Sequence, residues 1–339
     1  MRVLAGDIGG TNARFIYAEV DAKAKRINNR RIIAKKSYAS VNYSSFIKVL
    51  NAFLHEHNIT SSIDAACFAV AGPVKNGVVA VTNLPWIISE KELEKNLQIS
   101  KVKLINDFIA VVYGLDELKD IDIVTLQQGE VNSNSTKHIS SQPDAVVIGA
   151  GTGLGVAHRI WLNNHYYALS TEAGHAGFAP ENELQCQLLQ WLQKKQSHVS
   201  LENILSGKGL VTIYNFLREQ EQLAESVAVV EAMQKNDPAQ VITEHALSAR
   251  DDLCHKTLEC FIDIYGSATG NAALHFFPVD EVYIAGGIAS NIKDILVGDR
   301  FINAFNNKGL MSANMKQITI KLILQENIGL YGALSVVRA

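Results

Sequence analysis

Two glycine-rich segments hold the residues of this 339-residue sequence that are best suited to chemistry. The first contains Gly6, Asp7, Ile8, Gly9, Gly10 and Thr11, and the second, at 149–155, contains Gly151, Thr152 and Gly153. Neighbouring glycines let backbone N–H groups reach phosphate oxygens with no Cβ in the way. The Thr11 hydroxyl adds a donor, and a carboxylate such as Asp7 at a strand end can hold Mg²⁺ or its waters. The two segments therefore indicate binding of nucleotide phosphates.

The residues that follow each glycine segment decide which kind of phosphate loop is present. In dinucleotide-binding and Walker folds the loop leads into a helix, whose N-terminus receives the phosphate. Here residues 13–20 and 156–160 have the composition of strands, and neither segment matches GxxxxGK[ST] or a complete GxGxxG. A single glycine pair could serve only to build a tight turn. Its repetition in the second half of the chain favours a nucleotide held by two β-hairpins.

The elements that must position these loops follow from hydrophobic periodicity. A helical face is predicted from Phe46 to Leu54, Ser89 and Glu92 form a capping-box pattern, and Asp237-Pro238 is a helix start. Polar segments at 21–29 and 127–143 are predicted to be a turn and a surface loop. Strands are predicted at 2–5, 13–20, 30–38, 65–71, 102–105, 145–148, 282–285 and 317–324, a mainly helical region at 183–277, and a last helix at 328–337. Antiparallel strands followed by β-α alternation predict mixed sheets covered by helices.

Length and composition limit the class of protein. A chain of 339 residues with 47% hydrophobic residues is large enough for two domains with buried cores. A net charge of −3 gives no reason to expect nucleic acid or a membrane surface as a partner. We find no targeting segment and no apolar stretch of membrane-spanning length. The cysteines at 67, 186, 254 and 260 form no CxxC pair, so we expect reduced thiols in a cytoplasmic protein.

Several segments, in order along nearly the whole chain, resemble the bacterial-type glucokinase family of the actin-like ATPase and sugar-kinase superfamily. They are GDIGGTNAR at 6–14, AGPV at 71–74, TNLPW at 82–86, LINDF at 104–108, GAGTGLGVAH at 149–158, EAGH at 172–175, HVSLENILSGKGL at 198–210 and IAGGI at 284–288. The resemblance implies a two-domain actin-like (ribonuclease H-like) α/β fold with the active site in the interdomain cleft. It implies a small domain of residues 1–117 plus 326–339 and a large domain of residues 118–325.

The resemblance also implies an activity: phosphorylation of a hexose, D-glucose above all, by ATP with Mg²⁺, in a cytoplasmic homodimer of glycolysis. Asp107 is then the general base, and the two glycine segments are the phosphate loops. The sugar ligands implied are Asn83, Asn106, Asp107, Glu172, His175 and Glu202, while Gly286 and Gly287 face the adenosine and Asp7 holds Mg²⁺ through water. His198, next to these motifs, is predicted instead to be a buried histidine with a structural role.

The sequence departs from the family pattern in two places and leaves alternatives open. Ser170, Thr171 and Ala173 stand where a Pro-Gly pair and a glycine are expected around the EAGH segment, and the polar insert at 127–143 is longer than the family needs. The cysteine-rich zinc motif and the DNA-binding extension of the related repressor group are absent. The alternatives are a kinase for another acceptor, such as an amino sugar or a carboxylate, and an ATP-switched binding protein without catalysis.

Overall fold

The computed structural model describes residues 1–21, 30–59, 63–130, 142–220 and 223–338. The predicted turn at 21–29 and the predicted surface loop at 127–143 fall largely outside these residues. The chain divides into two compact units. Unit 1 comprises Met1–Asp122, Ala168–Ser170 and Gln325–Ala339, and unit 2 comprises Ile123–Tyr167 and Thr171–Leu324.

Unit 1 is built on a five-stranded mixed sheet in the order β3-β2-β1-β4-β7. Its strands are β1 Arg2–Ile8, β2 Asn12–Glu19, β3 Arg31–Ala39, β4 Ala65–Val70 and β7 Val102–Asn106, with a separate hairpin of β5 Val78–Ala80 and β6 Ile87–Ser89. Its helices are α1 Phe46–Glu56, α2 Glu90–Leu97, α3 Asp107–Gly114 and α13 Ile328–Arg338, with 3₁₀ turns η2 Ser40–Asn42, η3 Leu115–Glu117 and η4 Asp120–Asp122. The first three strands are antiparallel, whereas β1, β4 and β7 are parallel.

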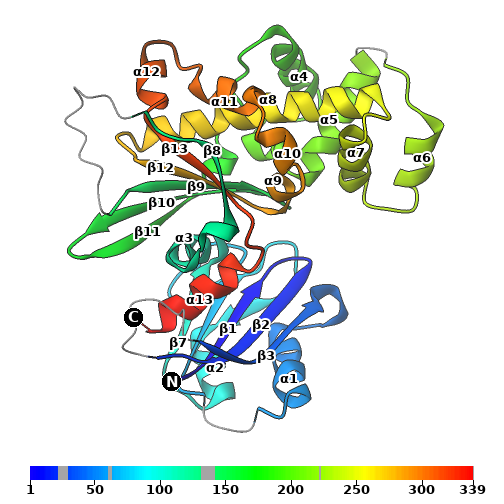
Figure 1. Cartoon of the computed structure of the whole chain (residues 1–339). Coiled ribbons are helices and arrows are strands. Elements are labelled where there is room, and N and C mark those ends of the chain that lie inside the picture. The colour runs from blue at the N-terminus through cyan, green and yellow to red at the C-terminus, as the bar shows by residue number, and fades with distance from the viewer. Residues whose placement is uncertain (22–29, 60–62, 131–141, 221–222, 339) are drawn as a thin grey trace. The chain divides into compact units, whose positions relative to one another are not determined.

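Alternate residues of β1 pack on opposite faces of this sheet, as the period of a strand requires. Leu4 packs in a cluster with Phe15 and Phe53, the latter from α1. Val3 and Ala5 belong to a second cluster that includes residues of α13. The two helices thus cover opposite faces of the sheet (Figure 1).

Unit 2 contains a six-stranded sheet in the order β11-β10-β9-β12-β13-β8. Its strands are β8 Ile123–Gln127, β9 Ala145–Ala150, β10 Leu154–Leu162, β11 His165–Thr171, β12 Glu281–Ala285 and β13 Thr319–Ile323; within β11, Ala168–Ser170 are grouped with unit 1. Its helices are α4 Glu183–Gln193, α5 Gly207–Gln220, α6 Val227–Met233, α7 Pro238–Leu247, α8 Asp252–His275, α9 Gly287–Asn291, α10 Lys293–Leu296, α11 Asp299–Asn306 and α12 Ser312–Met315. The 3₁₀ turns are η5 Ala173–His175, η6 Leu201–Asn203 and η7 Gly309–Met311.

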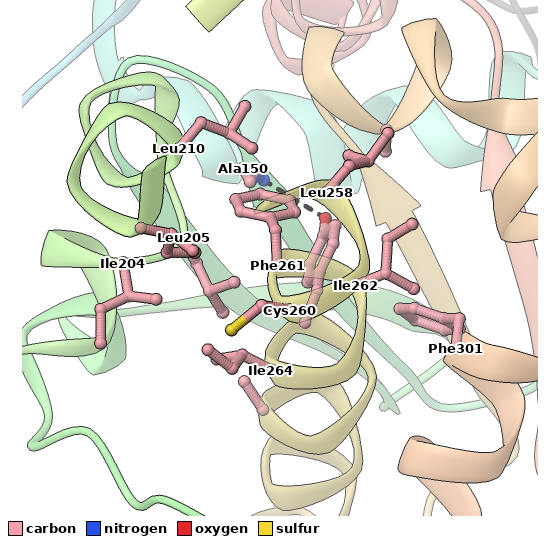
Figure 2. Packing of buried hydrophobic residues seen from close by; sticks show 14 of the residues in the cluster. Ala150, Ile204, Leu205, Leu210, Leu258, Cys260, Phe261, Ile262, Ile264 and Phe301 are labelled. Atoms are coloured by element: carbon pink, nitrogen blue, oxygen red, sulfur yellow. Dashed lines mark hydrogen bonds between the residues drawn. The ribbon is translucent and has the colours of Figure 1, made fainter. Parts of the chain in front are cut away.

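The long helix α8 lies at the centre of the hydrophobic core of unit 2 (Figure 2). Its residues Leu258, Phe261 and Tyr265 are buried against side chains of α5 and α11. The Tyr265 hydroxyl accepts a hydrogen bond from the Ala150 N–H at 3.3 Å. The helix therefore holds the end of β9, where the second glycine loop begins.

The structure confirms that each glycine segment joins two strands. The β1–β2 and β9–β10 pairs are antiparallel hairpins, which excludes the strand-to-helix nucleotide loops. The predicted helix start at Asp237-Pro238 is also confirmed, since the Asp237 carboxylate accepts from the Gln240 N–H at 3.0 Å. The capping box at Ser89 is wrong in detail: α2 begins there, but the Ser89 side chain makes no capping hydrogen bond.

Two further expectations concern the thiols and the membrane. All four cysteines are free thiols, three of them buried, as expected for a reduced protein. Within the residues that the structure describes, no helix combines the length and apolar character needed to cross a bilayer.

Candidate functional site

The first glycine loop lies at the end of the β1–β2 hairpin in unit 1. Gly6 and Ile8 are buried within β1, so only their backbone could take part in binding. The Gly9 N–H donates to the Asn12 carbonyl at 2.9 Å, which closes the turn. Thr11, in contrast, is exposed. A phosphate at this loop would therefore be met by the Gly10 and Thr11 end of the turn.

Asp7 is placed opposite Arg14 by the hairpin register. The Arg14 guanidinium lies 3.7 Å from the Asp7 carboxylate and also donates to the Glu326 carbonyl at 3.2 Å, next to α13. Burial raises the pKa of Asp7, and Arg14 acts in the opposite direction. Sequence reasoning did not single out Arg14, although its position seven residues after Asp7 across a two-strand hairpin could have indicated the pair.

Asn106 and Asp107 lie where β7 ends and α3 begins. Asn106 is the N-cap of α3 and accepts from the Phe108 N–H at 2.9 Å and the Ile109 N–H at 3.3 Å. Asp107 is the first residue of the helix, and its carboxylate accepts from the Phe108 N–H at 2.9 Å. The N–H groups of a helix's first turn stabilise negative charge, so this position suits a carboxylate base.

The parallel strands bring these residues to the same edge of the sheet. In the register, Ile8 of β1 is level with Val70 of β4, and Val70 is level with Asn106 of β7. Asn83 belongs to the same region, because its Cβ would lie 3.6 Å from a Cβ added at Gly10. Unit 1 thus gathers the first glycine loop, Asn83, Asn106 and Asp107. This is the edge at which α/β sheets usually bind ligands.

The second glycine loop is the turn between β9 and β10 in unit 2. The Gly151 N–H donates to the Gly153 carbonyl at 2.8 Å, and Thr152 is exposed at the tip. Gly286, at the end of the neighbouring strand β12, has φ of +92°, and a Cβ there would lie 2.4 Å from the Ala150 carbonyl oxygen. The structure therefore brings the second loop together with Gly286 and, directly after it, Gly287.

The three predicted sugar ligands of unit 2 lie on two short 3₁₀ segments. Glu172 is the N-cap of η5 and His175 is its last residue; both are exposed, with the His175 Nε2 4.0 Å from the Glu172 carboxylate. Glu202 lies in η6, and its Oε2 accepts from the Leu154 N–H at 2.8 Å. The Leu154 N–H belongs to the residue that follows Gly153, so Glu202 is in direct contact with the end of the second glycine loop.

Thr171, one of the departures from the family pattern, has a structural role in this region. Its hydroxyl donates to the Val156 carbonyl at 2.8 Å and accepts from the Ala173 N–H at 3.2 Å. These bonds attach the Glu172–His175 turn to β10. The Thr171 hydrogen bonds therefore fix the backbone of the turn at the place where a Pro-Gly pair was expected.

The prediction for His198 is wrong in one respect. The residue is exposed rather than buried, and its Nε2 hydrogen bonds to the His175 carbonyl oxygen at 2.9 Å. The pattern of hydrophobic and polar residues could not predict this hydrogen bond, because His198 lies 23 residues from His175 along the chain. The residue contacts the backbone of the turn that carries two of the predicted sugar ligands.

Few protein side chains near the glycine loops could bind Mg²⁺. Within the described part of the chain, no group of three His, Cys, Asp or Glu side chains is arranged to hold a metal ion. Asp7 is a single carboxylate at the first glycine loop, and Mg²⁺ beside a nucleotide is commonly held by one or two carboxylates together with phosphates and waters. The donor set fits a magnesium ion carried mainly by the nucleotide.

Comparisons with known proteins agree over nearly the whole chain. The family model described as Glucokinase matches residues 4–339. The chain is 39% identical over 344 residues to the glucokinase of Trichormus variabilis, covering 98% of this chain and 97% of the relative, and 38% identical to that of a Nostoc species with the same coverage. The crystal structure of a glucokinase from an Antarctic psychrotroph superposes with a TM-score of 0.80 at 31% identity, covering 99% of this chain and 98% of that one.

Proposed function

The chain belongs to the glucokinase family, and from this premise we propose that it transfers the γ-phosphoryl group of ATP to the 6-hydroxyl of D-glucose. The observation that carries the proposal is the gathering of the first glycine loop and the Asn106–Asp107 pair at one edge of the unit 1 sheet. A phosphate loop can bind the phosphoryl donor, and a carboxylate beside it at a helix N-terminus can take the proton of the acceptor hydroxyl. The relatives at 38–39% identity carry the same activity in their names.

Asp107 acts as the general base in this proposal. Its carboxylate takes the proton of the 6-hydroxyl while the new O–P bond forms and the bond between the γ-phosphorus and the β,γ-bridging oxygen breaks, releasing ADP. Phosphoryl transfer has a loose transition state, so catalysis depends mainly on positioning and charge stabilisation. Asn106 contributes by capping α3, which fixes the start of the helix on which Asp107 stands.

The remaining predicted residues select and orient the two substrates. Several hexose hydroxyls can hydrogen bond to the side-chain oxygens and the imidazole nitrogen of Asn83, Glu172, His175 and Glu202. An epimer of the hexose would leave some of these side chains without a partner. The loops at Gly9–Thr11 and Gly151–Gly153 receive the phosphates, with Gly286 and Gly287 beside the adenosine. Asp7 would hold Mg²⁺ through water, and the ion would neutralise charge on the phosphates when bound.

We assign the protein to the cytoplasm, to glycolysis and to a homodimer on the resemblance to the family alone. Light scattering on the purified protein would test the homodimer. The activity is tested by ADP release with a panel of acceptors: D-glucose, other hexoses, an amino sugar and acetate. Turnover with glucose supports the proposal, and turnover with another acceptor but not with glucose overturns it.

A further inference from the structure

The segment from His198 to Gly207 lies between the turn that carries the sugar ligands and the second glycine loop. On one side, the Leu201 N–H donates to the Ala176 carbonyl, the Phe178 N–H donates to the Val199 carbonyl, and the His198 ring bonds the His175 carbonyl, each at 2.9 Å. Three hydrogen bonds thus tie the segment to the Glu172–His175 turn and to the residues that follow it, as far as Phe178.

On its other side the same segment is tied to the phosphate loop. The Gly207 N–H donates to the Gly151 carbonyl at 2.9 Å, and the Glu202 Oε2 accepts from the Leu154 N–H at 2.8 Å. The two bonds hold the loop at Gly151 and at the residue directly after Gly153. The 198–207 segment therefore contacts both the proposed hexose ligands and the proposed phosphate ligands, all within unit 2.

Glu202 connects the two sets of ligands most directly, because it is itself a proposed hexose ligand and also bonds the residue after Gly153. Its Oε2 is committed to the Leu154 N–H, whereas Oε1 has no hydrogen bond to any residue that the structure describes. The close fit depends on Gly153, because a Cβ there would lie 2.3 Å from the Glu202 Oε2. The backbone of Glu202 is fixed as well: its carbonyl accepts from the Ser206 hydroxyl at 2.8 Å, and the Ser200–Asn203 capping box closes η6.

We propose that Glu202 couples the two substrates: with Oε1 bonded to a hexose hydroxyl, its Oε2 holds the second glycine loop in the form that binds nucleotide phosphates. The inference rests on the proposed function, since it requires a hexose at Glu202. A hexose hydroxyl on Oε1 favours the carboxylate position in which Oε2 accepts from the Leu154 N–H, so the form of the loop that binds nucleotide becomes more populated. Linkage then requires the nucleotide to raise hexose affinity by the same factor.

The experiment measures the dissociation constant of a non-hydrolysable ATP analogue by calorimetry, with and without saturating D-glucose. For the wild-type protein we expect glucose to tighten nucleotide binding about fivefold or more, the lower end of typical coupling. In Gly153→Ala the added Cβ displaces the carboxylate from Leu154, so nucleotide binding without glucose weakens. The ratio of the nucleotide dissociation constant without glucose to that with glucose should then fall toward one. Gly177→Ala is the matched control, because the nearest atom to its Cβ would be 4.0 Å away; it should keep the wild-type ratio.

A second variant covers the case in which Gly153→Ala does not fold. Glu202→Gln keeps an oxygen for the Leu154 N–H but weakens the contact with the hexose, so the factor by which saturating glucose tightens nucleotide binding should fall. A full wild-type ratio in either folded variant would overturn the coupling. The proposed function is judged separately: wild-type turnover with glucose alongside an unchanged ratio in the variants would sink only the coupling, whereas no turnover with glucose would sink both.

Discussion

The crossing of α3 and α13 gives the sharpest prediction for stability, because it depends on one missing side chain. The two helices lie side by side in unit 1 (Figure 1). A Cβ added at Gly332 of α13 would lie 1.7 Å from the Ala110 carbonyl oxygen and 2.8 Å from the Gly114 nitrogen of α3. Both obstacles are backbone atoms, which cannot turn aside as a flexible side chain can. Gly332→Ala must therefore push the helices apart.

The size of the effect follows from that overlap. A methyl group and a carbonyl oxygen do not approach closer than about 3 Å, so the helices must separate by about 1 Å, and overpacking of this kind costs about 1–3 kcal/mol. We expect the upper end, reduced by about 0.5–1 kcal/mol because alanine restricts the unfolded chain more than glycine does. The net loss of about 2 kcal/mol corresponds to a fall in Tm of about 4–8 °C. Because Asp107 opens α3, displacing the helix by about 1 Å should also lower kcat by about 10²-fold.

Differential scanning calorimetry and a glucose kinase assay on the same preparations test this prediction. Gly207→Ala is the matched control: Gly207 also lies in a helix, and the nearest atoms to an added Cβ would be 3.8 Å away. The control should unfold at or slightly above the wild-type temperature. A Gly332→Ala protein with the wild-type Tm and the wild-type kcat would refute the argument that this crossing fixes the position of Asp107.

Two further predictions concern the base and a helix cap. Asp107→Asn should lower kcat by about 10²–10⁴-fold, the usual contribution of a general base, with the nucleotide dissociation constant unchanged; near-wild-type turnover would exclude the role. Asp251→Ala, which removes the N-cap of α8, should cost about 1 kcal/mol in urea unfolding at pH 7. Burial alone would raise the pKa of Asp251, but hydrogen bonds with Cys254 and Ser226 lower it overall, so its stabilisation is present above about pH 4 and is lost as pH falls further. Asp251→Asn, which keeps an acceptor, should therefore show a weaker loss of stability between pH 5 and pH 2 than the wild type, and an identical acid profile would contradict this.

Local patterns were enough to predict most of the elements around the site. The β-branched residues after each glycine segment predicted strands rather than helices, and the structure confirms both hairpins. Asp237-Pro238 predicted a helix start because both residues act within one turn. The Ser89 cap was wrong because a capping pattern shows only that the bond is possible, whereas the side chain's final partner depends on the folded surroundings.

Contacts between distant segments could not be predicted in this way. The bonds of Glu202 to Leu154 and of His198 to His175 join residues 48 and 23 positions apart, and no periodicity in the sequence encodes them. The same is true of the close approach of α3 and α13. The predicted roles of the site residues came from resemblance rather than from spacing, and they stay predictions until variants are measured.

The central claim is that this chain phosphorylates glucose with ATP, and the most direct test is to identify the product. The purified protein should be incubated with ATP, Mg²⁺ and D-glucose, and the sugar product analysed by ³¹P NMR while ADP release is followed in parallel. We predict glucose 6-phosphate formed in equal amount to ADP. ADP release without a phosphorylated sugar, or turnover with acetate and none with glucose, would contradict the account.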